Sequence, residues 1–560
     1  MRNTYSQLLS TTKMRLYLSI FILLFFGSKS YSKVELSETD KLVQLAKVWG
    51  FLKYYHPHVS KGKFDWDKEL IQIIPKIEKA KSKDQISSAY NEWIATLGNV
   101  KNCRKCKNQK VETFDKNFNL NWISDTSDFN NELTNALLQI ESNRRLNKKY
   151  YVEYANKKPS QAQMVNEEIY DMETWNDSKI RLITLFRYWN FVEYFFPYKY
   201  QTDKSWDKVL EYFIPIFLNA ETETEFHLAL LELVASINDS HGVFITEQTF
   251  EYFGNKFLPV KIKYIDGVGV VTGYYDDSLA YIDDFKVGDI ITQIDGLDIS
   301  TKYENLKKYI TGSNEEKKKS NAYKYIFNGV TDTVEIEFKR NGQLYSKVVH
   351  RYMYKDFNIS KNSKSTYEVL PNNVGYINMG WLERENVHQV FNELNSTNGL
   401  ILDFRSYPNS TWDLIIDYVS STEKEFCKII YPLLDYPGKY IVNEPFKCGA
   451  NSPKKYKGKV VLLVSEDTQS HAEYSVMSLQ TGDNVVTVGS RTSGADGNTT
   501  TFRMFNNYKT MITGTGVFYP DMTVTQREGI KIDYEVNPTI KGISKNKDEL
   551  LMKAIELILN

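Results

Sequence analysis

Ser470 stands where an apolar run gives way to a helical pattern. The run "VVLLV" (460–464) is short and rich in β-branched residues, so it predicts a buried strand. Ala472, Val476 and Leu479 then follow at helical spacing. A serine between a buried strand and a helix is well placed for nucleophilic chemistry in an open α/β sheet. It is also well placed as an N-cap, because Glu473 completes a capping box, and this stretch alone favours the cap.

A serine nucleophile needs a base within hydrogen-bond reach, and the chain has seven histidines. His241 is the best placed, because it follows "NDS" at the expected end of a helix and precedes Gly242. His471 is a poor base, since adjacent side chains on a helix diverge, but its backbone N–H is a natural oxyanion donor. His227 is expected to be solvated on a helix. A structural role for His241, capping a helix C-terminus, remains open.

The region before His241 repeats itself. The segment "KVWGFLKYYHP" (47–57) resembles "RYWNFVEYFFP" (187–197) at an ungapped offset of 140 residues. Trp49 then matches Trp189, and Pro57 matches Pro197. The pattern predicts a duplicated helical unit, with copies at residues 33–150 and 166–250. Lys101 lies opposite His241, so only the second copy carries a histidine at its end, which indicates a task for that histidine.

Composition gives no global attraction to nucleic acid or to an anionic membrane. The 560 residues include 70 basic and 70 acidic side chains, and 42% are hydrophobic. Residues 1–32 are expected to be a signal peptide, with a basic stretch, an apolar core at 16–26 and small residues for cleavage. That core is too short for a stable membrane span. The mature protein is therefore expected to be exported, in a periplasm or outside the cell.

Four cysteines suit such a compartment, where disulfides form. The pairings that are local in sequence are Cys103 with Cys106 and Cys427 with Cys448. A zinc site built from Cys103, Cys106, His56 and His58 is a less favoured alternative, because it lacks a second ligand pair at zinc-site spacing.

The elements that must position Ser470 form an alternating pattern. Strands are predicted at 374–379, 400–404, 460–464 and 485–489, with helices near 384–394, 412–419 and 471–480. This alternation predicts an α/β layer with parallel strands. Before it lie two predicted hairpins, with turns at Asp266–Gly267 and Asn341–Gly342. The stretch between them, "KVGDIITQIDGLDI" (286–299), looks like the signature of a PDZ domain, which can bind peptide ends or serve as a spacer.

These residues resemble the C-terminal processing (tail-specific) peptidase family, in particular its tricorn-core-like branch, from about residue 180 onward. The stretch "TQSHAE" (468–473) looks like the family's Thr-x-Ser-x-x-Glu motif, with Ser470 in the nucleophile position. "DSHG" (239–242) looks like the branch's Ser-His pair, with Ser240 supporting and His241 as the base. "VGYINMG" (374–380) and "GLILDFRSYPNS" (399–410) resemble two strand motifs. The resemblance implies a crotonase-like peptidase core at 365–560 and a PDZ-like domain at 256–352.

Departures from the family pattern bear on the mechanism. Ala495 occupies the position of the lysine in family members with a Ser–Lys dyad, which favours a Ser–His mechanism. The resemblance places the second oxyanion donor in the loop that contains Ser406 and Tyr407. The third catalytic position falls on Gln526 in strict register, while Glu528 is the nearest carboxylate. Gln could orient His241 but would not stabilise imidazolium by charge.

The sequence thus predicts an α/β multidomain protein with duplicated N-terminal helical units, a PDZ-like β-rich insert and a crotonase-like peptidase core. The predicted function is that of an exported serine peptidase acting on proteins or peptides, with no cofactor, no metal, no nucleic-acid partner and no stable membrane span. The alternative is a peptide-binding or scaffold protein on the same fold whose catalysis has decayed. The irregular oxyanion loop and the unsettled third catalytic residue motivate that alternative.

Overall fold

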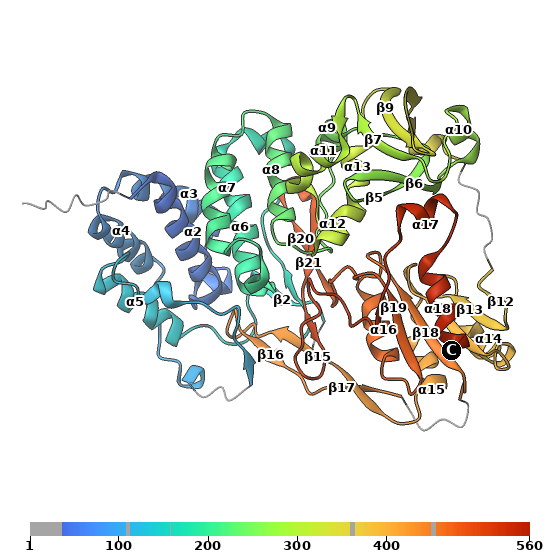
Figure 1. Cartoon of the computed structure of the whole chain (residues 1–560). Helices are drawn as coiled ribbons and strands as arrows, with labels where there is room; N and C mark the ends of the chain where they lie inside the picture. The colour runs from blue at the N-terminus through green and yellow to red at the C-terminus, as the bar shows by residue number, and fades with distance from the viewer. Residues whose placement is uncertain (1–35, 108–111, 157, 359–364, 450–454) are drawn as a thin grey trace, which may run out of the picture.

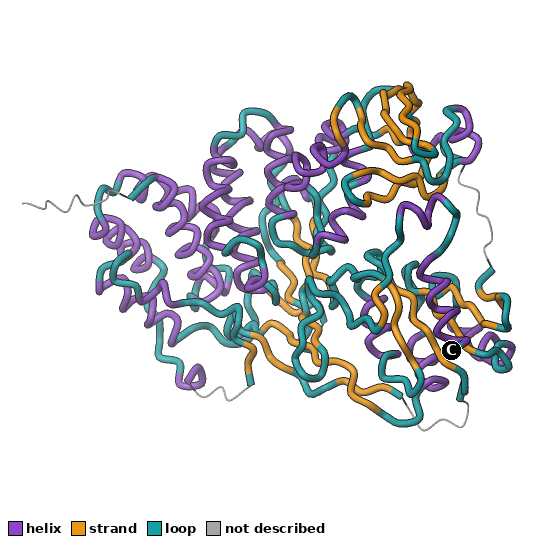
Figure 2. Tube along the Cα trace, in the orientation of Figure 1, coloured by secondary structure: helices purple, strands orange, loops and turns teal. Residues whose placement is uncertain are grey.

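The computed structural model describes residues 36–107, 112–156, 158–358, 365–449 and 455–560 (Figure 1). The predicted signal peptide lies outside these residues. Within the described ranges, no helix is both long enough and apolar enough to cross a membrane. Helices gather toward the N-terminal end of the chain, and strands dominate the insert and the C-terminal part (Figure 2).

Two helical units lie side by side (Figure 1). In the first, Trp49 Nε1 donates to Trp66 O at 3.0 Å and Trp66 Nε1 donates back to Trp49 O at 3.1 Å. In the second, Trp189 and Trp206 exchange the equivalent bonds at 2.8 and 2.9 Å. The units therefore share one internal geometry at the offset found in the sequence. Their helices are α2 (Glu38–Tyr55), α3 (Trp66–Lys79), α4 (Lys83–Thr96) and α5 (Asn131–Ser142), then α6 (Ser178–Phe195), α7 (Trp206–Leu218) and α8 (Glu223–Ala235).

Helices α2 and α6 approach closely where Gly50 meets Asn190. Asn190 Nδ2 donates to Ala46 O at 3.0 Å. A Cβ atom on Gly50 would lie only 1.7 Å from Asn190 Oδ1, so no larger residue fits there without a shift. This contact joins the two units where α2 and α6 pack together.

The insert contains a six-stranded sheet in the order β10-β9-β7-β6-β5, with β8 beside β7. Both hairpin predictions are confirmed: Asp266–Gly267 joins β5 to β6, and Asn341–Gly342 joins β9 to β10. All four turn residues have positive φ, as a tight two-residue hairpin requires. The strands are β5 (Val260–Ile265), β6 (Val268–Tyr274), β7 (Ile290–Ile294), β8 (Leu297–Asp298), β9 (Thr333–Arg340) and β10 (Gln343–His350). Three helices of this region are used below: α9 (Glu247–Phe253), α12 (Glu315–Asn321) and α13 (Tyr323–Ile326).

The C-terminal part is built on a second six-stranded sheet, ordered β12-β13-β14-β18-β19-β23. The predicted parallel pairing is confirmed from β13 to β19. The edge strand β12 is antiparallel to β13. Because the central strands run in one direction, their carboxyl ends meet at one edge, where the loops carry the candidate chemistry. The strands are β12 (Tyr367–Leu370), β13 (Val374–Asn378), β14 (Gly399–Asp403), β18 (Lys459–Val464), β19 (Val485–Gly489) and β23 (Tyr534–Glu535).

Both faces of this sheet are covered, which explains why its strands read as continuous apolar runs. Leu400, Leu402 and Leu462 pack with α14 (Val387–Glu393), α15 (Trp412–Val419) and α16 (His471–Leu479) on one face. Ile401 and Val461 face the other way, against α18 (Glu549–Leu559). The helices near 384–394, 412–419 and 471–480 are thus confirmed, whereas α18 was not predicted.

Long strands connect this layer to the helical units. The antiparallel strand β15 (Lys424–Pro432) pairs with β16 (Tyr440–Val442), which in turn pairs with β1 (Thr113–Phe114) of the first unit. Tyr55 Oη donates to Pro437 O at 2.5 Å at the tip of this hairpin. A second hairpin, β20 (Thr499–Arg503) and β21 (Lys509–Thr513), reaches toward the second unit. These contacts hold the helices in place over the peptidase-like layer.

The two predicted disulfides have different outcomes. Cys103 and Cys106 are bonded, whereas Cys427 and Cys448 are free and buried, so the second prediction is wrong. The strand register explains this. On β15, Cys427 lies opposite Phe446, and Cys448 lies opposite Lys424. Cys448 Sγ instead contacts Ser478 O at 3.6 Å.

Candidate active site

Ser470 lies in the turn between β18 and α16 with an unusual backbone. Its φ of 56° and ψ of −123° fall in a region that costs a non-glycine residue about 1–3 kcal/mol and that occurs most often at functional sites. Ser37, an ordinary N-cap of this chain, has φ −61° and ψ 159° and accepts from Asp40 N. The predicted capping box with Glu473 is present, and Ser470 N donates to Glu473 Oε2 at 3.3 Å, but an N-cap does not require this backbone conformation. The cap alone therefore does not explain this serine.

The carboxylate of Glu473 holds the strained turn. Glu473 is fully buried and accepts from Thr492 Oγ1 at 2.6 Å, Gly494 N at 2.8 Å, Ala495 N at 3.0 Å and Ser470 N at 3.3 Å. Burial raises the pKa of Glu473, and these donors oppose that rise. Ser470 N also donates to Ala495 O at 2.9 Å. The Ser470 conformation is thus fixed by several bonds at once.

The sequence suggested that His241 ends a helix. In the structure it lies in a turn beyond α8. The helix ends at Ala235, and Asn238, with φ 52°, redirects the chain. Gly242 N donates to Asp239 O at 3.0 Å and closes the turn. The His241 side chain is only 7% exposed.

A hydrogen-bond chain fixes the tautomer of His241. Thr513 Oγ1 donates to Asp239 Oδ1 at 2.9 Å and lies 2.8 Å from His241 Nδ1. A hydroxyl has one proton, so Thr513 must accept from an Nδ1–H group, which leaves Nε2 as the unprotonated nitrogen. Asp239 Oδ1 lies 3.6 Å from Nδ1 itself. Burial acts to raise the pKa of Asp239, but its bonds to His241 and Thr513 outweigh burial and lower it.

The base turn and the nucleophile turn are bonded to each other. Gln469 Nε2 donates to Ser240 O at 3.3 Å, which joins the residues immediately before Ser470 and His241. Ser240 Oγ donates to Ser493 O at 3.1 Å, and Ser240 N donates to Ser313 Oγ at 2.8 Å. His241 Nε2 is buried and has no hydrogen-bond partner among the described residues. The structure thus brings the two turns together and leaves the basic nitrogen available.

Three backbone amides are candidates for an oxyanion site. His471 is the first residue of α16, so its N–H has no acceptor within the helix. Ser406 and Tyr407 are exposed, and no described residue accepts a bond from their amides. Their loop follows β14 and is anchored by Arg405, which donates to Asp403 and Asp548.

Neither of the two residues considered for the third catalytic position bonds to His241 in the described part of the chain. The Glu528 side chain is 66% exposed and accepts from Arg491 Nη2 at 2.8 Å. Gln526 is buried, and its Nε2 lies 3.4 Å from Ser313 Oγ. Asp239, by contrast, accepts from His241 N at 3.1 Å through its Oδ1. Asp239 was not predicted from the sequence, although its position two residues before His241 is a signal that could have indicated it.

Another buried carboxyl lies next to this site. Asp496 is 2% exposed, and its Oδ2 has no partner among the described residues. Its Oδ1 accepts from Gly497 N at 2.6 Å. Burial, and then the charge of Glu473, raise the pKa of Asp496 well above its usual range.

His227 has a structural environment, so the prediction that it is solvated is wrong. Its side chain is fully buried, with Nδ1 2.8 Å from Thr246 Oγ1. Burial lowers the pKa of His227 to about 4. Phe244 and Tyr508 pack edge-on against its ring, and Tyr508 comes from a segment distant in sequence.

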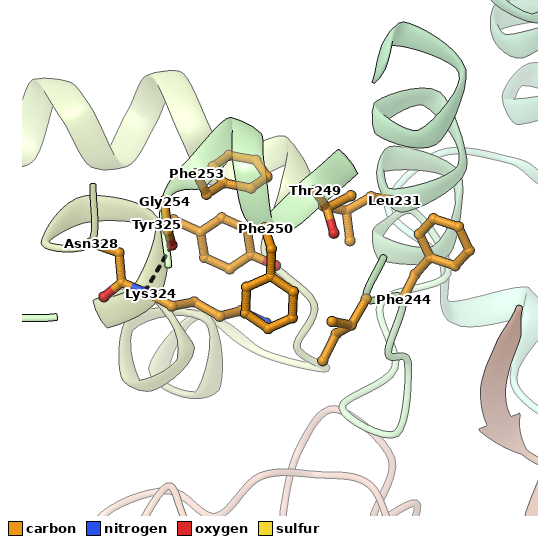
Figure 3. A pocket seen from close by; sticks show the side chains of 10 residues that line it. Leu231, Phe244, Thr249, Phe250, Phe253, Gly254, Lys324, Tyr325 and Asn328 are labelled. Carbon is orange, nitrogen blue, oxygen red and sulfur yellow. Dashed lines mark hydrogen bonds between the residues drawn. The ribbon is translucent and has the colours of Figure 1, made fainter. Parts of the chain in front are cut away.

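An apolar pocket of about 60 Å³ lies between α8, α9 and α13 (Figure 3). Figure 3 shows Phe250, Phe253 and Tyr325 gathered around it, and Asn328 Nδ2 donates to Gly254 O at 3.4 Å. Its volume is well below the roughly 300 Å³ at which ligand pockets begin. We therefore regard it as part of the joint between the second helical unit and the insert.

Comparison with known proteins agrees with this geometry. Residues 373–536 match peptidase family S41. The solved structure of mature CPAF complexed with lactacystin shares the fold, with a TM-score of 0.54 and 14% identity over 68% of this chain and 98% of that chain. A photosystem II D1 C-terminal processing protease matches with a TM-score of 0.38 and 15% identity, over 65% of this chain and 96% of that chain. No relative was found among curated proteins. The chain therefore carries, at residues 373–536, a region that matches peptidase family S41.

Proposed function

We propose that the chain is a serine peptidase with Ser470 as nucleophile and His241 as base. Ser470 Oγ attacks the carbonyl carbon of a peptide bond while its proton moves to His241 Nε2. Collapse of the tetrahedral intermediate breaks the C–N bond, and the leaving amine takes that proton. Water, deprotonated by the same nitrogen, then hydrolyses the acyl-enzyme.

The observation that carries this proposal is the pairing of a strained serine turn with a histidine turn. The Ser470 backbone is held in a costly conformation, and Gln469 bonds directly to Ser240 next to the base. A strained strand-to-helix turn is a known way to present a nucleophilic hydroxyl. The match of residues 373–536 to peptidase family S41 supports the same proposal.

We assign the orienting role to Asp239, acting through Thr513, rather than to Glu528 or Gln526. The ionised Asp239 carboxylate accepts the hydroxyl proton of Thr513. With its proton used in this way, Thr513 Oγ1 can only accept a hydrogen bond from His241 Nδ1–H. It also favours the imidazolium that forms during attack, as the third residue of a serine triad does. Ser240 is a positioning residue that ties the base turn to Ser493 and Ser313.

The proposed oxyanion site combines the His471 N–H with an amide of the Ser406–Tyr407 loop. The His471 donor lies at a helix N-terminus, where the partial positive charge favours an anion. The loop amides are supported by the Arg405 ion pairs at its base.

Location and domain roles are part of the proposal. The Cys103–Cys106 disulfide suits an oxidising compartment, and with the signal-peptide pattern it supports export. We propose that the core is crotonase-like and the insert PDZ-like, with proteins or peptides as substrates. Lys263 of the insert pairs with Glu466 at 2.7 Å, so the insert lies directly beside the nucleophile turn.

Incubation with an unfolded protein such as casein tests the proposal, using the full chain and Ser470→Ala. We expect cleavage only when Ser470 is present. Ser475→Ala is a matched control on the same helix, since Ser475 Oγ only donates to His471 O at 2.6 Å within α16. Equal cleavage by both Ser470 forms would contradict the proposal. Peptide binding without any cleavage would favour the scaffold alternative.

A further inference from the structure

A cleft of about 760 Å³ opens on the first helical unit, away from the residues described above. Six cationic side chains line it, and none of the lining residues that the structure describes is acidic. We call it the basic cleft. Its cations come from the turn after α2, the loop after α4 and the turn after α5: Lys61, Lys101, Arg104, Lys105, Arg144 and Arg145.

Most of this positive charge is uncompensated. Lys61, Lys101, Arg104 and Lys105 are exposed, and none forms an ion pair with a residue in the described ranges. The buried Lys149 lies close to the cations of the cleft, and its pKa reflects their charge. Burial lowers the pKa of Lys149 to about 7; Asp435 opposes this, and Arg145 and Arg144 lower it further.

The frame that carries the cations is rigid, which reduces the entropy cost of binding. The Cys103–Cys106 disulfide closes the loop after α4, and Cys103 N donates to Asn143 Oδ1 at 2.8 Å. Arg144 stacks on Tyr436, with its guanidinium carbon 3.6 Å from the ring centre. Arg144 Nε also donates to Asp435 O at 2.9 Å, so the cleft is fastened to the β15–β16 hairpin of the peptidase layer.

The basic cleft occupies the corner of the first unit that corresponds to the base turn of the second. At the offset of 140 residues, Asn99 matches Asp239 and Lys101 matches His241. Gly98 has φ 90° and its counterpart Asn238 has φ 52°, so both turns bend with a left-handed residue. The first unit therefore presents cations where the second unit presents the proposed base.

The lining chemistry narrows the class of ligand. Among the described lining residues the only aromatic ring is that of His58, whose Nδ1 lies 2.9 Å from Leu97 O, and none is Phe, Tyr or Trp, the side chains on which single-stranded nucleic acids mainly stack. Four asparagines line it instead, and amide side chains hydrogen-bond well to peptide groups. The volume lies within the range of ligand sites.

We propose that the basic cleft binds an acidic polypeptide segment of the substrate, at a distance in sequence from the bond that is cut. This inference rests on the proposed peptidase function for its role, although binding can be measured without catalysis. Carboxylates of the segment would pair with Lys61, Lys101, Arg104 and Lys105, and opposite potentials would steer its approach.

Binding is tested with the full chain carrying Ser470→Ala and a fluorescein-labelled glutamate-rich peptide, followed by anisotropy. The Lys101→Glu/Arg104→Glu variant should weaken binding at least about tenfold, because charge reversal turns attraction into repulsion. The Lys76→Glu/Lys79→Glu variant is the control, since these exposed lysines of α3 do not line the cleft. It should change affinity less than about twofold.

Catalysis provides the second readout. With active enzyme, the cleft variant should raise KM for a substrate with an acidic segment and leave kcat unchanged, and it should not affect a short neutral substrate. Equal weakening by both double variants would overturn the inference, as would binding of a sulfated oligosaccharide with no binding of the glutamate peptide. If the enzyme cleaves no substrate but the basic cleft still binds the glutamate peptide, the proposed peptidase function is refuted and the binding proposal is not.

Discussion

At the scale of single residues, Asp239 is the main departure from what the sequence suggested. It is buried, its pKa is lowered, and it reaches His241 through Thr513. Glu528, by contrast, is exposed and paired with Arg491. The identity of the orienting carboxylate is therefore open to a direct comparison of variants.

We predict that Asp239→Asn lowers kcat at least about a hundredfold, because an amide can reverse the Thr513 bond and place the proton on His241 Nε2. kcat/KM should fall by a similar factor, because the lost interaction acts in the transition state. Glu528→Gln should leave both quantities nearly unchanged. Steady-state kinetics from pH 5 to pH 9 measure them, and a larger effect of Glu528→Gln would contradict the assignment.

Thr513 offers a second check on the same chain of bonds. Thr513→Val removes the hydroxyl at nearly constant shape and should lower kcat, whereas Thr513→Ser should restore it. A purely structural role for Thr513 would give no such recovery of kcat in the serine variant.

We predict that Asp496→Asn stabilises the protein at pH 8 by about 1–3 kcal/mol relative to the wild type. Burial raises the pKa of Asp496 in the folded protein. Protonated Asp496 therefore contributes fully to the stability of the wild type below the unfolded pKa of about 3.9, and this contribution is lost as the pH rises through the folded pKa. Asparagine keeps the oxygen that accepts from Gly497 N and never ionises. Urea unfolding at pH 4 and pH 8 should show the difference only at pH 8; equal stability at both values would refute it.

At the scale of elements, the central strands and their helices were predictable because each leaves a local signal. The run at 460–464 is apolar throughout, and the run at 400–404 is apolar except for Asp403. The structure buries both runs between α14–α16 and α18. The hairpin turns carry Asp-Gly and Asn-Gly pairs. Elements whose surroundings come from distant segments were not predictable in this way. His227 is buried partly by Tyr508, and the Cys427–Cys448 pairing failed because the β15–β17 register separates the two residues.

The nucleophile turn depends on one carboxylate, which gives a prediction for the start of α16. Glu473→Gln keeps one acceptor oxygen but turns an NH₂ group toward buried N–H donors. We expect a loss of about 1–3 kcal/mol in the free energy of unfolding and a fall in kcat. Glu423→Gln, on the exposed stretch before β15, is the control for stability. Unchanged kcat in a folded Glu473→Gln variant would show that this carboxylate does not position Ser470.

At the scale of the whole molecule, the candidate site is assembled from three parts of the chain. The second helical unit supplies His241, the C-terminal layer supplies Ser470, and α12 of the insert reaches Asp467 through Lys317 at 3.1 Å and Ser320 at 2.8 Å. Burial acts to raise the pKa of Asp467, but Lys317 and Ser320 outweigh it and lower it. The sequence indicated the order of these parts, but it could not show which contacts join them.

The contact of α12 with Asp467 leads to a prediction about coupling. Asp467→Ala should increase amide exchange in α12 and in the turn before Ser470, and lower kcat/KM a few-fold, with little change in Tm. The effect on Tm is small because the Asp467 side chain is 54% exposed and water screens the ion pair. Unchanged exchange in both segments would show that the insert is not coupled to the nucleophile turn.

The central claim is that His241 activates Ser470, and labelling with a fluorophosphonate followed by peptide mass mapping tests it most directly. We predict a single adduct on Ser470, absent in Ser470→Ala. His241→Ala should label at least about a thousandfold more slowly, while His471→Ala, which keeps its backbone amide, should label at nearly the wild-type rate. An adduct on another residue, or equal labelling rates for His241→Ala and the wild type, would contradict the account.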